Sequence, residues 1–463
     1  MELGELGRVH FVGIGGAGMS GIARIMLSRG LEVSGCDARD SRAVAALRAR
    51  GALVEVGHDA AHLRDVDTLV VSSAIRPNNP ELAEAERRGL QVLPRAAALA
   101  AVMSGLRGIA VAGTHGKTTT TSMLTVALQA CGRDPSYAIG GDLSEPGSNA
   151  HMGTGEFFVA EADESDGSFL LLTPEVAIVT NVEADHLDNY GDAAAVQEVF
   201  RQFVGCIQRG GCLLVGADDD GSRGLVSIGE EAGLRVATFG LAAEADVRVD
   251  DLRLEAGLPR FEVVAGGRRL GSVALRIPGA FNAVNAAGAL AAGLQLGLPF
   301  TDMVRGLEEF TGARRRFEFK GVSRGVRVYD DYAHHPTELR ALLDAARQVT
   351  GEGRLVTVFQ PHLYSRTQSF AAQFASALAA SDLAVVMEVY AAREDPVPGV
   401  TGALIADQVD LPAGRVVFEP SWTAVPAVIA SMVRPGDVVL TVGAGDVTLL
   451  GPEILAAIEE ARG

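Results

Sequence analysis

The sequence predicts an α/β protein that is divided into three domains. It has 463 residues, and globular domains average about 150 residues. Short apolar strands alternate with helical segments along the whole chain, which is the pattern of β-α-β units around a mostly parallel sheet. Two glycine-rich segments each follow such a strand and precede a helix. We therefore expect a Rossmann-like N-terminal domain, a central P-loop ATPase-like domain and a Rossmann-like C-terminal α/β domain.

The N-terminal domain is expected over residues 1–105. Its first strand ends in a glycine-rich turn, and the helix that follows stops at Gly30. An alanine-rich connecting helix then places the boundary near residue 105. In chain order, these segments are the strand RVHFVGI, the helix SGIARIMLSRG, the strands LEVSGCD and DTLVVSSAI, and the connecting helix PRAAALAAVMSGLRG.

The central domain is expected over residues 106–312. It opens with the strand GIAVAG, a second glycine-rich loop and a long threonine-rich helix, and its later strands are FFVAEA, VAIVTNV and GCLLVGA. Residues 246–277 change character, because apolar and polar residues alternate there around glycine turns. This alternation predicts β-hairpins appended to the sheet.

The C-terminal domain is expected over residues 313–463. It begins near GARRRFEFKG, a basic cluster in an otherwise acidic chain. A third set of apolar strands follows, separated by helical segments, and predicts another mostly parallel sheet. These strands are GVRVYDDYA, RLVTVFQP, LAVVMEVY, GRVVFE and DVVLTVGAG.

Charge and composition exclude several classes of function. The formal net charge of −18 and the pI near 5.0 argue against a nucleic-acid binder, which needs a basic face. No apolar run reaches the roughly 18 residues of a membrane span, so no membrane insertion is expected. The N-terminus has no signal-peptide pattern. Free thiols and a cytoplasmic location are expected, because no disulfide or zinc spacing relates Cys36, Cys131, Cys206 and Cys212.

The first glycine-rich segment, HFVGIGGAGMSGIA, fits the dinucleotide fingerprint. Gly13, Gly15 and Gly18 follow a strand and open a helix, and Asp37 ends the next strand. Such glycines let the backbone approach a pyrophosphate, and the acid can reach a ribose. The pattern therefore indicates NAD or FAD, but any nucleoside diphosphate would suit the same helix N-terminus.

The second segment, AVAGTHGKTTTTSML, is a variant phosphate loop. Gly116, Lys117 and Thr118 match its end, while Val111 stands where the first glycine of the general motif is expected and Gly113 shortens the loop. Backbone N–H groups and the Lys117 ammonium can hold phosphates, and the Thr118 hydroxyl can bind Mg²⁺. This segment predicts a site for ATP or GTP, for which a hydride-transfer enzyme has little use.

Acidic and histidine-rich groups follow strands elsewhere in the chain. AEADESDGSF and TNVEADHLDNY each place carboxylates just past a strand of the central domain, the second with His186. Oxygen ligands of this kind suit Mg²⁺, and parallel strands bring them to one edge of the sheet. DDYAHHPTE and FQPHLYSRTQ place histidines with Asp or Arg at strand ends of the C-terminal domain.

The segments GIGGAGMSGIA, GTHGKTTT, EADESD, TNVEADHLD, FNAVNAAGA, RRRF, DDYAHHPTE and FQPHLYSRT follow one another along the chain. In this order they resemble the ATP-dependent ligases of cytoplasmic peptidoglycan precursor synthesis, the Mur ligase family, over essentially the whole length. The resemblance implies an enzyme that joins L-alanine to the lactyl carboxylate of UDP-N-acetylmuramate. The carboxylate would attack ATP to give an acyl phosphate and ADP, and the amine would then displace phosphate.

The resemblance also implies roles for individual residues of the first two domains. The UDP-sugar contacts would be Gly13, Gly15, Gly16, Gly18, Asp37, Ser72 and Ser73. The ATP phosphates would lie on Gly113, Thr114, His115, Gly116, Lys117, Thr118 and Thr119. Two Mg²⁺ ions, or Mn²⁺, would use ligands from the set Thr118, Glu161 and His186.

For the remaining ATP contacts the resemblance implies Asn282, Asn285, Arg315, Arg316, Asp331 and His334, the last four in a C-terminal domain that closes on ATP and the amino acid. The amino-acid end would be lined by His362, Tyr364 and Arg366. Lys117, His186, His362 and Arg366 are the candidate catalytic residues, and either histidine could accept the proton of the incoming ammonium group. A monomer or a homodimer is expected.

One residue departs from the family pattern. Phe281 stands before Asn282 where such ligases usually have histidine. Phenylalanine cannot form a hydrogen bond to adenine, although it can stack on a base.

Three alternative functions remain open from the sequence. One is the sister ligase that attaches a recycled tripeptide to the same sugar, although the segment GIGGAGMSG favours the alanine enzyme. Another is an NAD-dependent dehydrogenase, which nucleotide binding would distinguish. The last is a non-catalytic, ATP-switched binding protein, in which ATP turnover would not require an amino acid.

Overall fold

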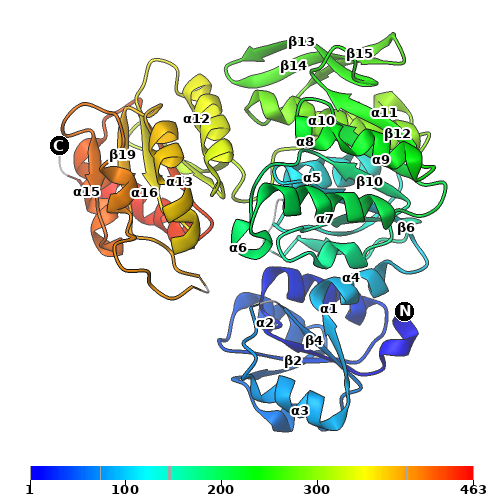
Figure 1. Ribbon diagram of the computed structural model, residues 1–463. Coiled ribbons are helices and arrows are strands. Elements are labelled where there is room, and N and C mark those ends of the chain that lie inside the picture. Colours follow the sequence, from blue (N-terminus) through cyan, green and yellow to red (C-terminus); the bar gives the residue numbers. More distant parts are fainter. Residues whose placement is uncertain (1, 73, 144–146, 393, 462–463) are drawn as a thin grey trace. The chain divides into compact units, whose positions relative to one another are not determined.

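The computed structural model describes residues 2–72, 74–143, 147–392 and 394–461 (Figure 1). The described strands form sheets of five, ten and six strands. The chain divides into two compact units. The first comprises Met1–Asp250, Glu262–Val273 and Val284–Phe310, and the second comprises Asp251–Phe261, Ala274–Ala283 and Thr311–Gly463.

The five-stranded sheet has the order β3-β2-β1-β4-β5, and its strands pair in parallel. This is the order of a Rossmann half with the glycine-rich turn at the end of its central strand. The strands are β1 (Val9–Val12), β2 (Val33–Asp37), β3 (Leu53–Val56), β4 (Thr68–Val71) and β5 (Gln91–Pro94). The helices are η1 (Leu3–Leu6), α1 (Ala17–Ser28), α2 (Arg42–Arg48), η2 (Ala60–Leu63), α3 (Pro80–Arg88) and α4 (Arg95–Met103).

The ten-stranded sheet has the order β15-β14-β13-β12-β11-β10-β6-β9-β7-β8. Its centre is parallel and its strands there are buried, as expected for a sheet covered on both faces. The strands are β6 (Arg107–Ala112), β7 (Ser136–Ala138), β8 (Ala150–His151), β9 (Phe157–Glu161), β10 (Val176–Val179), β11 (Cys212–Gly216), β12 (Arg235–Gly240), β13 (Val247–Glu255), β14 (Leu258–Ala265) and β15 (Arg268–Ala274).

The helices of this region are α5 (Lys117–Ala130), η3 (Ser168–Leu171), α6 (Leu187–Tyr190), α7 (Ala193–Gly205), α8 (Asp220–Arg223), α9 (Leu225–Glu231), α10 (Ala280–Gln295) and α11 (Phe300–Glu309). α5 begins directly after the loop that follows β6, and α11 packs along it. Consequently the carboxyl ends of β6, β9 and β10, which are neighbours in the sheet, share one edge with the N-terminus of α5.

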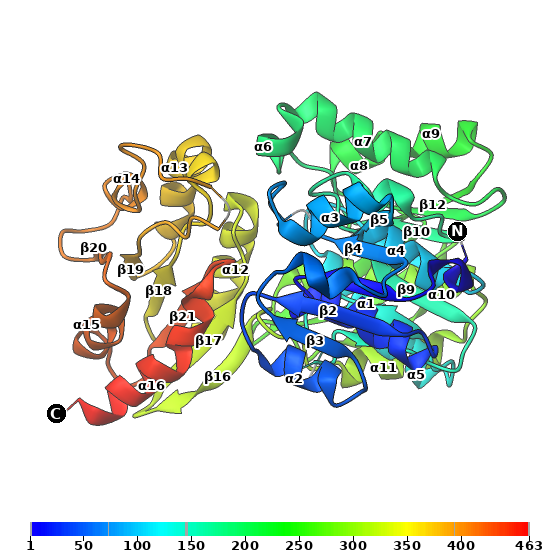
Figure 2. The same cartoon turned by 90° about the horizontal axis from the view of Figure 1, so that it is seen from below.

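The six-stranded sheet has the order β16-β17-β21-β18-β19-β20, parallel except for the β16–β17 pair. Leu339 of α12 and Phe374 of α13 pack on one face, and Ile429 of α15 and Ile454 of α16 pack on the other. Figure 2 shows α16 lying along β16 and β17. The strands are β16 (Glu318–Ser323), β17 (Val326–Asp331), β18 (Leu355–Phe359), β19 (Leu383–Val386), β20 (Val416–Phe418) and β21 (Val438–Val442). The helices are α12 (Pro336–Thr350), α13 (Tyr364–Leu378), α14 (Ala403–Ala406), η4 (Trp422–Ala424), α15 (Val425–Met432), η5 (Asp446–Leu449) and α16 (Leu450–Glu460).

The predicted α/β architecture is confirmed, including the strands appended to the central sheet, since β13, β14 and β15 follow one another at its edge. The prediction omitted β3, β5, β7, β8, β12 and β16. Among the described residues, no helix is both long and apolar enough to cross a membrane. All four cysteines are free, as expected.

Candidate active site

The loop between β6 and α5 has the close packing of a phosphate-binding loop. Gly113 and Gly116 have φ angles of +125° and +82°. A Cβ atom at Gly113 would lie 2.1 Å from the hydroxyl oxygen of Thr180, and one at Gly116 would lie 2.5 Å from Oδ1 of Asn285. Only glycine fits at both positions, and the loop leads directly into a helix N-terminus that favours anions.

Lys117, the first residue of α5, lies between the loop and an acidic side chain. Its Nζ atom donates to the carbonyl oxygens of Gly113 and Thr114 at 2.7 and 3.1 Å, and to Glu164 Oε1 at 2.8 Å. Burial would lower the pKa of Lys117, but Glu164 and Asp163 outweigh it and raise that pKa. The lysine therefore stays charged inside the site.

Glu164 is buried beneath this lysine. Burial raises the pKa of Glu164 to about 7, although the positive charge of Lys117 acts in the opposite direction. His186 Nε2 lies 3.7 Å from Glu164 Oε1 and 3.7 Å from Asp185 Oδ2. The predicted catalytic residues Lys117 and His186 therefore share one carboxylate neighbour.

Thr118 and Glu161 form a pair of oxygen donors at the same edge. The Thr118 hydroxyl donates to Glu161 Oε1 at 3.0 Å, and Glu161 Oε2 accepts the N–H of Gly140 at 2.7 Å. A hydroxyl and a carboxylate at the end of a phosphate loop are a donor set that suits a hydrated, phosphate-bound Mg²⁺. Thr119, the next residue of the predicted phosphate contacts, is buried.

The segment after β10 forms hydrogen bonds to the loop between β6 and α5, because β10 is the neighbour of β6 in the sheet. The His115 N–H donates to Asn181 Oδ1 at 2.8 Å, and the Thr180 hydroxyl donates to the His115 carbonyl oxygen at 2.5 Å. The Glu183 N–H donates to the Thr114 hydroxyl at 2.9 Å. The sequence analysis did not single out Thr180 or Asn181. Their position directly after a strand that neighbours β6 is the signal that could have identified them.

The two asparagines predicted on the adenine side both lie on α10 but contact different segments. Asn285 Oδ1 accepts the hydroxyl of Thr120 at 3.3 Å and lies against Gly116. Asn282 donates to the carbonyl oxygen of Pro278 at 2.7 Å. The Phe281 ring is 38% exposed and covers Gly279.

The N–H groups of the glycine-rich turn between β1 and α1 are bonded within the turn and to the end of β2. The N–H groups of Gly13 and Ile14 donate to the Cys36 carbonyl oxygen at 2.8 and 2.9 Å, and the Gly16 N–H donates to the Gly13 carbonyl oxygen at 3.1 Å. The Gly15 N–H donates to Asp37 Oδ2 at 2.9 Å. Asp37 thus supports the turn itself, in addition to the ribose contact that the fingerprint predicts.

Arg95 lies against the same turn and was not predicted. A Cβ atom at Gly18 would lie 2.8 Å from Arg95 Nη1, and Arg95 Nη2 pairs with Asp163 at 3.3 Å. Arg95 therefore connects the glycine-rich turn to the residue that precedes Glu164. Ser72 follows β4 at the same edge of the sheet and is partly buried. Ser73 lies outside the described residues.

The basic pair predicted in the second unit packs on one aromatic ring. The guanidinium carbons of Arg315 and Arg316 lie 4.7 and 5.4 Å from the centroid of the Tyr332 ring. Arg315 also donates to the carbonyl oxygens of Gly443 and Gly445 at 2.6 and 2.9 Å. Such a cation–π arrangement holds both guanidinium groups at the end of β17.

Asp331 ends β17 and is buried. Its two carboxylate oxygens accept the N–H groups of Phe317 and Ala333 at 2.7 and 2.8 Å. Burial raises the pKa of Asp331 to about 6, although Arg316 and these hydrogen bonds act in the opposite direction.

The structure brings His334, His362 and Arg366 together after the ends of β17 and β18, the two strands that flank β21. The rings of His334 and His362 are 6.1 Å apart, and the His362 ring stacks on Tyr390 at 5.8 Å. Arg366 Nη1 lies 3.5 Å from His362 Nδ1. Tyr364 is the first residue of α13 and is partly buried.

Models of one protein family match most of the chain. The descriptions are "Mur ligase family, catalytic domain" for residues 8–107, "Mur ligase middle domain" for residues 111–293 and "Mur ligase, glutamate ligase domain" for residues 315–445.

Two full-length relatives share one name. A UDP-N-acetylmuramate–L-alanine ligase of Acidothermus cellulolyticus is 60% identical over 459 residues, which cover 99% of this chain and 96% of that protein. The enzyme of the same name from Saccharopolyspora erythraea is 59% identical and covers 99% and 94%. A solved UDP-N-acetylmuramate-alanine ligase from Thermotoga maritima superposes with a TM-score of 0.81 at 29% identity, covering 98% of this chain and all of that one.

Fold and site together define an α/β enzyme with a phosphate loop for ATP. The chain belongs to the Mur ligase family, whose members are ATP-dependent ligases that form carbon–nitrogen bonds.

Proposed function

We propose that this protein joins L-alanine to the lactyl carboxylate of UDP-N-acetylmuramate, at the expense of ATP, in peptidoglycan precursor synthesis. The observation that carries the proposal is the full-length match at 60% identity to a ligase of that name. The geometry of the loop around Lys117 supports it, because the loop combines a helix N-terminus, a charged lysine and oxygen donors for Mg²⁺.

The proposed division of labour follows the three sheets. Residues 1–105 would bind the UDP-sugar through the turn at Gly13–Gly18, with Asp37 and Ser72 beside it. Residues 106–312 would bind ATP on the loop Gly113–Thr119. Residues 313–463 would supply the remaining ATP contacts and the amino-acid end. This proposal is supported by the position of these groups after the carboxyl ends of parallel strands, where α/β sheets bind their ligands.

The first chemical step is the attack of the lactyl carboxylate oxygen on the γ-phosphorus of ATP. The bond from that phosphorus to the bridging oxygen breaks, and ADP leaves with an acyl phosphate as the other product. Lys117 would neutralise the transferring phosphoryl group, and the loop would hold the phosphates in line. Mg²⁺, when bound through Thr118 and Glu161, would supply further neutralisation of phosphate charge.

In the second step the amine of L-alanine attacks the acyl carbon and inorganic phosphate leaves. The ammonium form must first lose a proton. We propose His362 as its acceptor rather than His186, because His362 lies 3.5 Å from Arg366, whose guanidinium would hold the α-carboxylate of the amino acid. His186 instead lies near Glu164 and Lys117, where the phosphate is transferred.

A phosphate-release assay with panels of UDP-sugars and amino acids tests this function. Release should require UDP-N-acetylmuramate and an amino acid together, and L-alanine should be preferred. L-Alanine and glycine differ by one methyl group, and contact with one methyl group contributes about 1–3 kcal/mol to discrimination. Selectivity for L-alanine over glycine should therefore be roughly 10–200-fold. Preference for L-Ala-γ-D-Glu-meso-diaminopimelate would identify the recycling ligase instead. Saturable NADH binding without turnover would identify a dehydrogenase.

The finer properties are also proposals. Two Mg²⁺ ions are proposed, one on Thr118 and Glu161 and one near His186, and Mn²⁺ is expected to replace them. Dependence of the rate on free Mg²⁺ at fixed MgATP tests the second ion. Action in the cytoplasm, as a monomer or homodimer, is proposed because the substrates are nucleotides and the thiols are free.

A further inference from the structure

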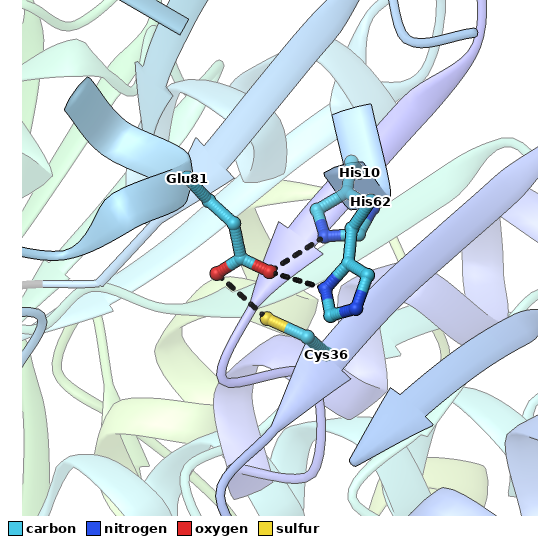
Figure 3. Close-up of side chains that lie close together, drawn as sticks. All are labelled: His10, Cys36, His62 and Glu81. Atoms are coloured by element: carbon cyan, nitrogen blue, oxygen red, sulfur yellow. Dashed lines mark hydrogen bonds and ion pairs between the residues drawn. The ribbon is translucent and has the colours of Figure 1, made fainter. Parts of the chain in front are cut away.

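A second group of metal-binding side chains lies in the N-terminal sheet, outside the site described above. We call it the His10 cluster, and its members are His10, Cys36, His62 and Glu81 (Figure 3). They come from four separate elements, β1, β2, η2 and α3. Figure 3 shows the two imidazole rings and the thiol directed toward the Glu81 carboxylate. The His10 cluster could not be predicted from the sequence, because its four residues have no regular spacing.

The donor atoms are close enough to share one ion. The Cys36 thiol donates to Glu81 Oε2 at 3.0 Å, His62 Nδ1 lies 2.8 Å from Glu81 Oε1, and His10 Nε2 lies 3.7 Å from the same oxygen. One ligand atom of each residue lies within 4.8 Å of those of the others. Zn²⁺ holds nitrogen and oxygen at about 2.0–2.2 Å and sulfur at about 2.3 Å, so only small side-chain shifts would be needed to surround it.

His10 is already arranged as a metal ligand. Its side chain is 1% exposed, and its Nδ1 atom is 2.9 Å from the Ser34 hydroxyl. Its Nε2 atom is buried, points toward Glu81 and has no hydrogen-bond partner among the described residues. A metal-bound histidine characteristically donates its other ring N–H to an oxygen, which leaves the remaining nitrogen lone pair for the metal. Ser34 can accept in this way.

The charges of the cluster also match a divalent ion. Glu81 is fully buried, and the Cys36 thiol and the Nδ1 atoms of His58 and His62 lie 3.0, 3.0 and 2.8 Å from its carboxylate oxygens. As zinc ligands, the Glu81 carboxylate and the Cys36 thiolate would contribute two negative charges, which Zn²⁺ balances while both histidine ligands stay neutral. A buried site without net charge avoids the cost of an uncompensated ion.

We propose that the His10 cluster binds one Zn²⁺ ion through His10, Cys36, His62 and Glu81, as a structural site below the glycine-rich turn. Two nitrogens, a sulfur and an oxygen suit zinc, whereas Mg²⁺ prefers oxygen ligands alone. Binding would release the thiol proton of Cys36 to solvent, so zinc affinity should fall at acidic pH.

The site would stabilise the turn through the backbone of one ligand. The Cys36 carbonyl oxygen accepts the N–H groups of Gly13 and Ile14, and its neighbour Asp37 accepts that of Gly15. Fixing the Cys36 side chain would therefore hold the end of β2 in place beneath the turn. His58 lies 3.1 Å from the thiol and 3.0 Å from Glu81 Oε2, and would remain a hydrogen-bonding neighbour of the bound ligands.

The test is metal analysis of the full-length, untagged protein. After gel filtration the wild type should retain about one zinc per chain, since a four-ligand site is closed. Co²⁺ added to the chelator-treated protein should give a thiolate-to-cobalt charge-transfer band in the near ultraviolet. Cys36→Ser should abolish that band, and His62→Gln, which alters a partly exposed residue, should weaken metal retention without a large packing defect.

Cys206→Ser is the matched control, because Cys206 is a free thiol at the end of α7, outside the cluster. It should leave zinc content and the cobalt band unchanged. A folded wild type that holds less than about a tenth of an equivalent of zinc, and that gives no thiolate band with Co²⁺, would show that the cluster is a hydrogen-bonded polar network only. The same conclusion would follow if Cys206→Ser removed the band. Ligase activity enters none of these readouts, so this result is independent of the proposed function.

Discussion

The two glycine loops of this protein share a backbone design and differ in their charges. Each connects a buried parallel strand to a helix, and each uses glycines with positive φ, Gly13 at +75° and Gly116 at +82°. The turn after β1 is supported by a carboxylate, because Asp37 accepts the Gly15 N–H. The loop after β6 instead carries Lys117, with Glu164 beneath it and Thr118 bonded to Glu161.

This difference in charge suits the first loop to binding a phosphate and the second loop to transferring one. Backbone donors and a helix N-terminus are enough to bind a diphosphate that does not react. A phosphoryl group in transfer develops charge that must be neutralised at a fixed place, and a lysine and carboxylate-bound Mg²⁺ can do this. The comparison predicts that changes at the second loop affect the rate, whereas changes at the first affect binding of the UDP-sugar.

The largest expected effect is at Lys117. Lys117→Ala should lower kcat by at least the roughly 10²–10³-fold that is typical of losing one preorganised charge-stabilising donor. The fold should persist, because the pKa of Glu164 is already raised to about 7 and its carboxyl can stay protonated without the lysine. Steady-state phosphate release at saturating ATP measures the effect.

Arg201→Ala is the control, since Arg201 is an exposed residue of α7 that pairs with Glu198 and has no role in the proposed site. It should leave kcat unchanged. Near-normal turnover by Lys117→Ala would contradict the assignment of the second loop to phosphoryl transfer.

The next largest effect is a pH dependence at Asp331, a strand-end aspartate that resembles Asp37 but is buried. Its pKa is raised from 3.8 to about 6, chiefly by burial. The folded state therefore favours the neutral form, and this stabilisation is present below pH 3.8 and lost as the pH rises through about 6. Since one pKa unit is worth about 1.4 kcal/mol, the loss should be at most about 3 kcal/mol.

Urea unfolding followed by tryptophan fluorescence can measure this loss, because the chain's one tryptophan, Trp422, lies in the same unit as Asp331. Asp331→Asn is neutral at every pH, so its stability difference from wild type should change across that window. Asp344 is exposed, so the stability difference between the Asp344→Asn control and wild type should be the same at every pH in this window. An unvarying difference between wild type and Asp331→Asn would show that folding does not raise the pKa of Asp331.

A smaller effect should distinguish the glycines themselves. Gly116→Ala combines a strained φ with a Cβ atom 2.5 Å from Asn285 Oδ1, whereas at Gly13 the nearest atom, Ile75 Cδ1, is 3.5 Å away. Strain of this kind costs about 1–3 kcal/mol. Gly116→Ala should reduce kcat/KM for ATP by roughly 5–150-fold. Gly13→Ala should cause a smaller loss in kcat/KM for the UDP-sugar. The reverse order would contradict the packing described for the two loops.

Much of the fold could be predicted from the sequence because the central strands are apolar runs bounded by glycine turns. Most of the strands that were not predicted lie at or near sheet edges, whereas β12 lies inside the ten-stranded sheet. In β3, Leu53 and Val56 are 76% and 52% exposed, so this strand has no buried apolar run. β5 lies at the other edge of that sheet, and β16 joins the third sheet in antiparallel orientation next to the predicted β17. Pairing with a neighbour, rather than burial, defines these strands.

The site was predictable where one loop holds the whole motif and less so where partners come from other strands. Gly113–Thr118 could be assigned from local spacing. Thr180, Asn181 and Arg95 could not, because their contacts with the loops depend on which strands are neighbours in the sheet. The His10 cluster was missed for the same reason, since its members are brought together by the sheet order β2-β1-β4 and the helices beside it.

The smallest effect tests what Asp37 does in the first loop. The dinucleotide fingerprint assigns this acid to the ribose, whereas its Oδ2 atom accepts the Gly15 N–H at 2.9 Å. Asp37→Ala should therefore raise KM for UDP-N-acetylmuramate about fivefold, as expected for the loss of one hydrogen bond of about 1 kcal/mol, with kcat unchanged. Asp37→Asn keeps an acceptor oxygen and should be closer to wild type. The 2′-deoxyuridine analogue of the substrate completes a double-mutant cycle. If Asp37 acts only through the turn, the losses from Asp37→Ala and from the missing hydroxyl should add to within about 0.5 kcal/mol. If the carboxylate binds the ribose directly, the analogue should lose little further affinity in the variant, and Asp37 would be a substrate contact rather than a support of the turn.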